Sequence, residues 1–137
     1  MPNLAEHRIL AVDDEPDNLV LFKATLEMLY EAQVEIAPDA ETALSLLDTY
    51  RPTYIVTDLS MPKTDGYALL RKLRARSDTQ ELPIVALTAH AMQGDKERVL
   101  EAGFDGYISK PFNVATLGDE LLNCLGEYEH RRISAAK

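Results

Sequence analysis

The sequence has little cysteine, little positive charge and no long apolar run. Cys124 is the only cysteine, which excludes an internal disulfide and suits a reducing cytoplasm. It lies among Leu121, Leu122 and Leu125, so we expect a buried structural thiol rather than a reactive one. No stretch approaches the roughly 18 apolar residues of a membrane helix. Residues 1–7 also lack the basic and apolar regions of a signal peptide. These absences favour a cytoplasmic protein that does not contact membranes.

Positive charge is scarce, because 14 Lys and Arg residues face 23 Asp and Glu residues and leave a net charge of −9. This balance argues against unaided binding to nucleic acid, whose phosphates attract basic patches. It allows a cation site built from carboxylates. No Cys/His cluster has zinc spacing, and there is no internal repeat, low-complexity run or linker. With 137 residues, 46% of them apolar, the chain predicts one domain with an ordinary core.

Short apolar runs alternate with helical patterns five times along the chain. The expected strands cover residues 8–12, 34–37, 54–58, 83–88 and 107–109. The expected helices cover about 16–30, 39–50, 67–76, 92–102 and 114–125. Leu29 in the first helix and Val114 in the last are expected to face the core, and Gly126 to end the last helix. This alternation predicts a parallel sheet with helices on both faces and right-handed crossovers.

The expected domain organisation is a leader at 1–7, one domain over 8–126 and a frayed polar tail at 127–137. The tail could instead extend the last helix or help the chain to dimerise, and the sequence leaves these alternatives open. We expect a complete single-domain protein rather than a module excised from a larger one.

Polar side chains follow the strands at their carboxyl ends. Asp13 and Asp14 follow the first strand, Asp58 ends the third, Thr88 ends the fourth and Lys110 follows the fifth. These ends share one edge of a parallel sheet, the edge where open α/β sheets bind ligands, so the side chains can converge. Close carboxylates raise one another's pKa, and a cation stabilises them. Oxygen ligands select Mg²⁺ or Mn²⁺ over zinc. A nearby lysine and hydroxyl suit an anion, such as a phosphoryl group on Asp58.

Each of these residues also has an ordinary structural interpretation. Asp13 could cap the first helix, Asp58 could cap the turn that follows it, and Thr88 could simply favour a strand. Lys110 taken alone is better read as a solvated lysine at the end of a strand. The complete set in this order favours a functional site.

Four short motifs stand at the ends of the first, third, fourth and fifth expected strands. They are Asp13-Asp14, Asp58 followed by Met61-Pro62 and Gly66, Thr88-Ala89, and Lys110-Pro111. Together they resemble the response-regulator receiver domain of two-component signalling, across about residues 8–126. The resemblance implies a flavodoxin-like α/β fold, with a five-stranded parallel sheet in the order 2-1-3-4-5 and helices on both faces.

The resemblance also implies a role for each residue of the motifs. Asp58 would be the phosphoacceptor, attacking a phosphohistidine or a small phosphodonor to form an acyl phosphate. Asp14 and Asp58 would ligate Mg²⁺ directly, with Mn²⁺ as a substitute. Asp13 would act mainly through water, and the backbone carbonyl of Ser60 would complete the protein ligands. Lys110 would pair with the phosphoryl oxygens.

Further residues are implied to transmit or tune the signal. Thr88 would move toward the phosphoryl group, and Tyr107 matches the aromatic switch residue that then turns inward, although ordinary sheet packing would also explain a tyrosine there. Ser60 and His90 hold the variable positions expected to tune the phosphoryl lifetime. The Lys110–Pro111 bond is a candidate cis peptide. The output surface would combine the fourth helix, the fifth strand and the fifth helix.

The implied partners are a histidine kinase or phosphotransfer protein as phosphoryl donor and an unidentified protein as target. Binding to nucleic acid or to a membrane is not expected. A homodimer is possible. Apart from self-phosphorylation and autodephosphorylation of Asp58, no enzyme activity is expected. One alternative is a receiver excised from a hybrid histidine kinase. A Mg²⁺-dependent haloacid-dehalogenase-type phosphatase is disfavoured, because Ser60 stands where that family has a second aspartate. A flavodoxin-like FMN binder is disfavoured, because the acidic loop after the first strand would repel the FMN phosphate.

Overall fold

The structure is a computed structural model that describes residues 3–89 and 93–135. A short 3-10 helix at Leu4–Glu6 precedes five strands and five helices. The strands are β1 (Arg8–Val12), β2 (Gln33–Ala37), β3 (Tyr54–Asp58), β4 (Ile84–Thr88) and β5 (Gly106–Ser109). The helices are α1 (Pro16–Tyr30), α2 (Ala40–Leu46), α3 (Gly66–Arg74), α4 (Gln93–Ala102) and α5 (Leu117–Ala135). Within the described residues, no helix is long and apolar enough to cross a bilayer.

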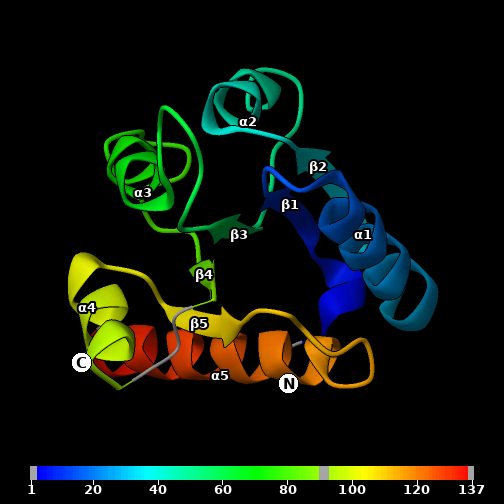
Figure 1. The fold of residues 1–137 in the computed structure, drawn as a ribbon. Helices are drawn as coiled ribbons and strands as arrows, with labels where there is room; N and C mark the ends of the chain where they lie inside the picture. Colours follow the sequence, from blue (N-terminus) through cyan, green and yellow to red (C-terminus); the bar gives the residue numbers. More distant parts are fainter. Residues whose placement is uncertain (1–2, 90–92, 136–137) are drawn as a thin grey trace.

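The strands form one parallel sheet in the order β2-β1-β3-β4-β5. Helices α1 and α5 cover one face, and α2, α3 and α4 cover the other (Figure 1). The structure therefore confirms the expected α/β class and strand order. Because both faces are covered, β3 and β4 are buried along their whole length, which explains their nearly continuous apolar sequences.

Alternate residues of each strand enter opposite halves of the core. On β3, Tyr54 and Val56 pack toward α1 and α5, whereas Ile55 packs toward α2, α3 and α4. The Tyr54 hydroxyl donates a hydrogen bond of 2.9 Å to the carbonyl of Leu121 in α5. Leu4 is also fully buried, so part of the expected leader belongs to the core.

Two residues expected in the core lie at the surface. Leu29 is 65% exposed, because in the last turn of α1 it is Tyr30 that packs against the core and lies beside Gly118. Val114 is 41% exposed, because α5 begins only at Leu117. The preceding residues form a turn around Asn113, whose side-chain oxygen accepts a 2.8 Å hydrogen bond from the Ala115 amide.

Helix α1 has the expected bounds, but the end of α2 differs from the sequence-based expectation. Helix α2 stops at Leu46 instead of continuing to about residue 50, and the Tyr50 hydroxyl donates a 3.0 Å hydrogen bond to the Ile9 carbonyl. The expected start of α4 at Met92 lies outside the described residues.

Helix α5 continues through Gly126 to Ala135, so the expected helix end and frayed tail are wrong over this stretch. A glycine inside a helix costs only about 1 kcal/mol, which tertiary contacts can offset. Here the Tyr128 hydroxyl donates to the Glu81 carbonyl, and Arg131 Nη2 donates to the Asp105 carbonyl at 2.9 Å.

Candidate functional site

The loop between β1 and α1 places one acidic side chain inside the protein and one at its surface. Asp13 is buried, and Asp14 is exposed. Asp13 Oδ1 accepts a 3.0 Å hydrogen bond from the Glu15 amide. The N-cap of α1 is Glu15, and Pro16 begins the helix, so the acidic loop is only three residues long. Asp13 therefore does not occupy the helix-cap position.

The third carboxylate, Asp58, ends β3 and is only 4% exposed. Its Oδ1 accepts a 3.3 Å hydrogen bond from the Ser60 amide. The loop that follows returns so closely that a Cβ on Gly66 would lie 2.4 Å from the Asp58 carbonyl oxygen. Only glycine fits at this approach, and Asp65 then caps α3 through a 2.9 Å bond from the Ala68 amide.

Lys110 connects the two buried carboxylates. Its Nζ lies 3.3 Å from Asp13 Oδ2 and 3.2 Å from Asp58 Oδ2, and its side chain is 12% exposed. The Lys110 amide also donates a 2.8 Å hydrogen bond to the Thr88 carbonyl, which fixes the end of β5 against β4. The Lys110–Pro111 peptide bond is cis. Lys110 is therefore largely shielded from solvent and paired with two carboxylates, rather than a solvated lysine at a strand end.

Burial and charge make Asp58 easier to protonate than an ordinary aspartate. Burial raises its pKa to about 6; the Asp13 charge adds to this effect, and Lys110 opposes it. For Lys110, burial acts to lower the pKa, but the Asp58 and Asp13 charges outweigh it, and the net pKa lies above the ordinary value. A single lysine ammonium thus lies between two buried carboxylates.

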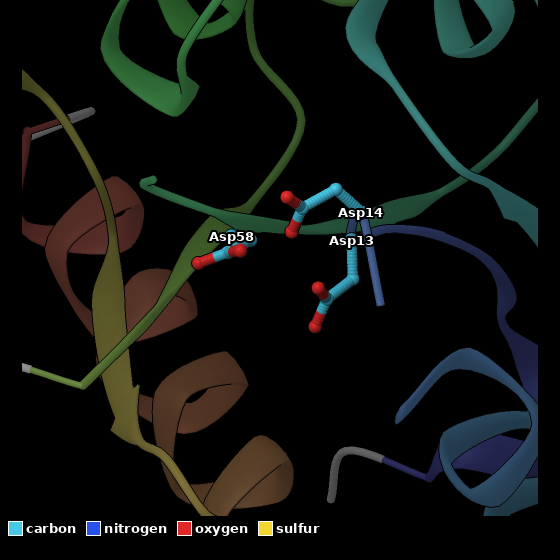
Figure 2. Close-up of side chains that lie close together, drawn as sticks. All are labelled: Asp13, Asp14 and Asp58. Carbon is cyan, nitrogen blue, oxygen red and sulfur yellow. The ribbon is translucent and has the colours of Figure 1, made fainter. Parts of the chain in front are cut away.

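Asp13, Asp14 and Asp58 can each offer one carboxylate oxygen within 4.8 Å of the others. Figure 2 shows the three side chains around one space, with Asp13 and Asp14 coming from the end of β1 and Asp58 from the end of β3. An all-oxygen set of hard donors fits Mg²⁺, and it provides none of the nitrogen or sulfur ligands typical of a zinc site.

Three more of the predicted residues, Ser60, Thr88 and Tyr107, lie within the part of the chain that the structure describes. Thr88 is buried at the end of β4, the strand beside β3. Ser60 is exposed in the loop after Asp58. Tyr107 lies half-buried on β5, with Lys96 Nζ 5.3 Å from its ring centroid. His90 lies outside the described residues.

Sequence reasoning missed Asn18 in the first turn of α1. Its Nδ2 donates to Asp13 Oδ2 at 3.3 Å and to Glu15 Oε2 at 3.4 Å. The available signal was its place three residues after the N-cap, where a polar side chain can reach back to the preceding loop.

Residues 9–122 match the family model of the response regulator receiver domain. The chain belongs to this family. As a receiver domain, it is a phosphorylation-activated signalling switch of the two-component type. The match does not favour the haloacid-dehalogenase or flavodoxin alternatives. Receiver domains bind Mg²⁺ in their active site, and the Asp13, Asp14 and Asp58 cluster fits this property.

Individual relatives agree with the family match. The receiver domain is 41% identical over 117 residues to an uncharacterized 14.6 kDa protein of Leptolyngbya boryana, covering 85% of this chain and 88% of that protein. It is 36% identical to the response regulator Rre1 of Synechocystis over 88% of this chain, but spans only 52% of the length of Rre1.

A solved structure adds information on the metal. The receiver domain of the sensor histidine kinase PA1611 from Pseudomonas aeruginosa is 37% identical, with a TM-score of 0.75 over 88% of this chain and 98% of that one. That structure has a magnesium ion coordinated in its active-site cleft.

Proposed function

We propose that Asp58 accepts a phosphoryl group from a histidine kinase or a phosphotransfer protein and that the modification changes a protein-binding surface on α4, β5 and α5. The observation that carries the proposal is the buried contact of Lys110 Nζ with both Asp13 and Asp58 at the carboxyl edge of the sheet. A lysine in this position neutralises a carboxylate in the resting protein and is available to a phosphoryl group once one is attached.

In the proposed transfer, an Asp58 carboxylate oxygen bonds to phosphorus while the bond from phosphorus to the imidazole nitrogen of the donor breaks. The imidazole leaves, and Asp58 becomes an acyl phosphate. With a pKa of about 6, Asp58 is mostly ionised at neutral pH and can act as the nucleophile. Lys110 then moves its ammonium from Asp58 Oδ2 to a phosphoryl oxygen, while Asp13 continues to hold it nearby.

Asp13, Asp14 and Asp58 are the residues proposed to hold Mg²⁺, with the Ser60 carbonyl completing the protein ligands. When bound, the ion supplies positive charge that offsets the carboxylate cluster and the incoming phosphoryl oxygens. Mn²⁺ prefers the same oxygen donors and is proposed as a substitute.

The signal is proposed to pass through Thr88 and Tyr107. The Thr88 hydroxyl hydrogen-bonds the phosphoryl group, and Tyr107 turns inward from its half-buried position. A cavity of about 300 Å³ between α4, β5 and α5 supports this choice of surface, because Tyr107, Lys96 and Leu100 are among its lining residues. Inward rotation of Tyr107 would reshape this cavity for a protein target. Ser60 and His90 are proposed to tune the phosphoryl lifetime.

The proposed setting is the cytoplasm, which suits the free buried thiol of Cys124. The donor class is supported by the receiver domain of the sensor histidine kinase PA1611, which shares this fold and 37% of its sequence with the chain. The proposed chemistry of the chain is limited to gain and loss of the phosphoryl group on Asp58.

The direct test is incubation with acetyl phosphate and Mg²⁺, followed by intact mass measurement. The wild type should gain one phosphoryl group that hydroxylamine removes, as expected of an acyl phosphate. Asp58→Asn should gain none, whereas Asp119→Asn, at an exposed position on α5, should be labelled like the wild type. Equal labelling of Asp58→Asn and wild type would refute the assignment of the phosphoacceptor.

A further inference from the structure

Asn18 links the first turn of α1 to the most buried acid of the site. It is half-buried, and its Nδ2 donates to Asp13 Oδ2 at 3.3 Å and to Glu15 Oε2 at 3.4 Å. The receiver motifs do not include this residue. Its side chain contacts neither Asp58 nor Lys110 in the hydrogen bonds that the structure describes, so its effect on the site passes through Asp13.

The Asp13 carboxylate receives donors on both oxygens. Oδ1 accepts the Glu15 amide at 3.0 Å, and Oδ2 accepts Asn18 and lies 3.3 Å from Lys110 Nζ. The lysine is shared with Asp58 and is the group that a phosphoryl oxygen would attract. In the hydrogen bonds that the structure describes, Asn18 donates to Asp13 and not to Asp58. It can therefore hold the orientation of Asp13 while Lys110 changes partner.

A side-chain amide suits this position because it is an uncharged donor. A neutral donor orients Asp13 without cancelling any of the negative charge that attracts a cation. A lysine or arginine would orient the same oxygen and weaken cation binding. Residues that orient a metal-binding carboxylate typically change the affinity for the metal, because an unoriented carboxylate loses conformational freedom when the ion binds.

We propose that Asn18 is a positioning residue that holds the Asp13 carboxylate ready for the divalent cation and thereby sets the affinity for Mg²⁺. This inference rests on the proposed Mg²⁺-dependent phosphorylation of Asp58. Asn18 takes no part in the transfer of the phosphoryl group, so its loss changes how much Mg²⁺ is needed and leaves the rate at saturating Mg²⁺ unchanged.

The experiment compares Asn18→Leu and Asn18→Ala with the wild type and with Gln33→Leu, which replaces another side-chain amide by leucine at an exposed position on β2. Calorimetric titration with Mg²⁺ should give a dissociation constant about tenfold higher for both Asn18 variants. In acetyl phosphate labelling, the Mg²⁺ concentration at half-maximal rate should rise by the same factor, with the maximal rate nearly unchanged. Gln33→Leu should match the wild type in both measurements.

A spectroscopic measurement without metal separates positioning from folding. The Glu15 amide donates to Asp13 Oδ1, so its ¹⁵N–¹H resonance reports on that carboxylate. In the Asn18 variants this resonance should move, while the resonances of the later turns of α1 stay in place. In Gln33→Leu this resonance should not move.

Three results would overturn the inference. The first is unchanged Mg²⁺ affinity in both Asn18 variants, and the second is a lowered maximal rate with unchanged Mg²⁺ dependence. The third is loss of the fold in both variants by circular dichroism, which would make Asn18 a structural residue. Failure of the proposed function is distinguishable, since in that case Asp58→Asn would be labelled like the wild type whatever Asn18 does.

Discussion

At the scale of single residues, folding disfavours the ionised form of the Asp58 carboxylate. Burial, with the Asp13 charge, raises its pKa from 3.8 to about 6. The folded protein therefore retains this proton at pH values where the unfolded chain has released it. The contribution of Asp58 to the stability of the metal-free protein therefore falls as the pH rises from 3.8 to about 6 and stays reduced above that range.

Asp58→Asn removes this charge and should stabilise the metal-free protein. Above about pH 6 we expect the free energy of unfolding to rise by about 1–3 kcal/mol, and the gain should shrink as the pH falls toward 3.8. Urea unfolding at pH 8 and at pH 5, with a chelator present, measures the difference. A gain of equal size at both pH values, or a loss of stability at pH 8, would contradict the electrostatic explanation.

At the scale of elements, Asp105 joins four parts of the chain at the amino end of the sheet. Its Oδ2 accepts 2.9 Å hydrogen bonds from Arg74 Nη2 of α3 and from the Ile84 amide of β4. Its backbone carbonyl accepts Arg131 Nη2 of α5, which also lies 3.5 Å from Asp105 Oδ1. This junction, beside β5, holds α5 in helical form beyond Gly126.

Removing this junction should lower stability in a graded way. Asp105→Ala should reduce the free energy of unfolding by about 2–4 kcal/mol, because the Arg74 guanidinium and the Ile84 amide lose a partner where the side chains are largely buried. Arg131→Ala should cost about 1 kcal/mol or less, because its side chain is half exposed. Arg98→Ala, an exposed arginine of α4 with a 3.8 Å ion pair, serves as the control and should change little. Equal losses of stability in all three variants would contradict the proposed contribution of the Asp105 contacts to stability.

The same elements explain what the sequence could and could not predict. Strands β1, β3 and β4 were predictable because each is a short, nearly continuous apolar run; β3 lies at the expected residues 54–58. The meeting of Asp13, Asp58 and Lys110 followed from their places at strand ends. Both ends of α1 were predicted, but the ends of α2 and α5 were not, because contacts distant in sequence decide them, such as Tyr50 with Ile9 and Arg131 with Asp105. The Asn18 contact depends on the path of the loop before α1, which the local sequence does not specify.

At the scale of the whole molecule, the acidic site and the proposed output surface lie on one continuous part of the sheet. The end of β4 carries Thr88, whose carbonyl accepts the Lys110 amide after β5, and β5 carries Tyr107. A change at Asp58 can therefore reach α4 and α5 through two adjacent strands. We expect an equilibrium between two packings that the phosphoryl group biases rather than creates.

The most direct test compares the ¹⁵N–¹H spectra of the Mg²⁺-bound protein before and after addition of beryllofluoride, which imitates a phosphoryl group on aspartate. The account predicts shifts around Asp58 together with shifts of Thr88, Tyr107 and α4, and no response in Asp58→Asn. Shifts confined to the surroundings of Asp58, or the same shifts in Asp58→Asn, would contradict it.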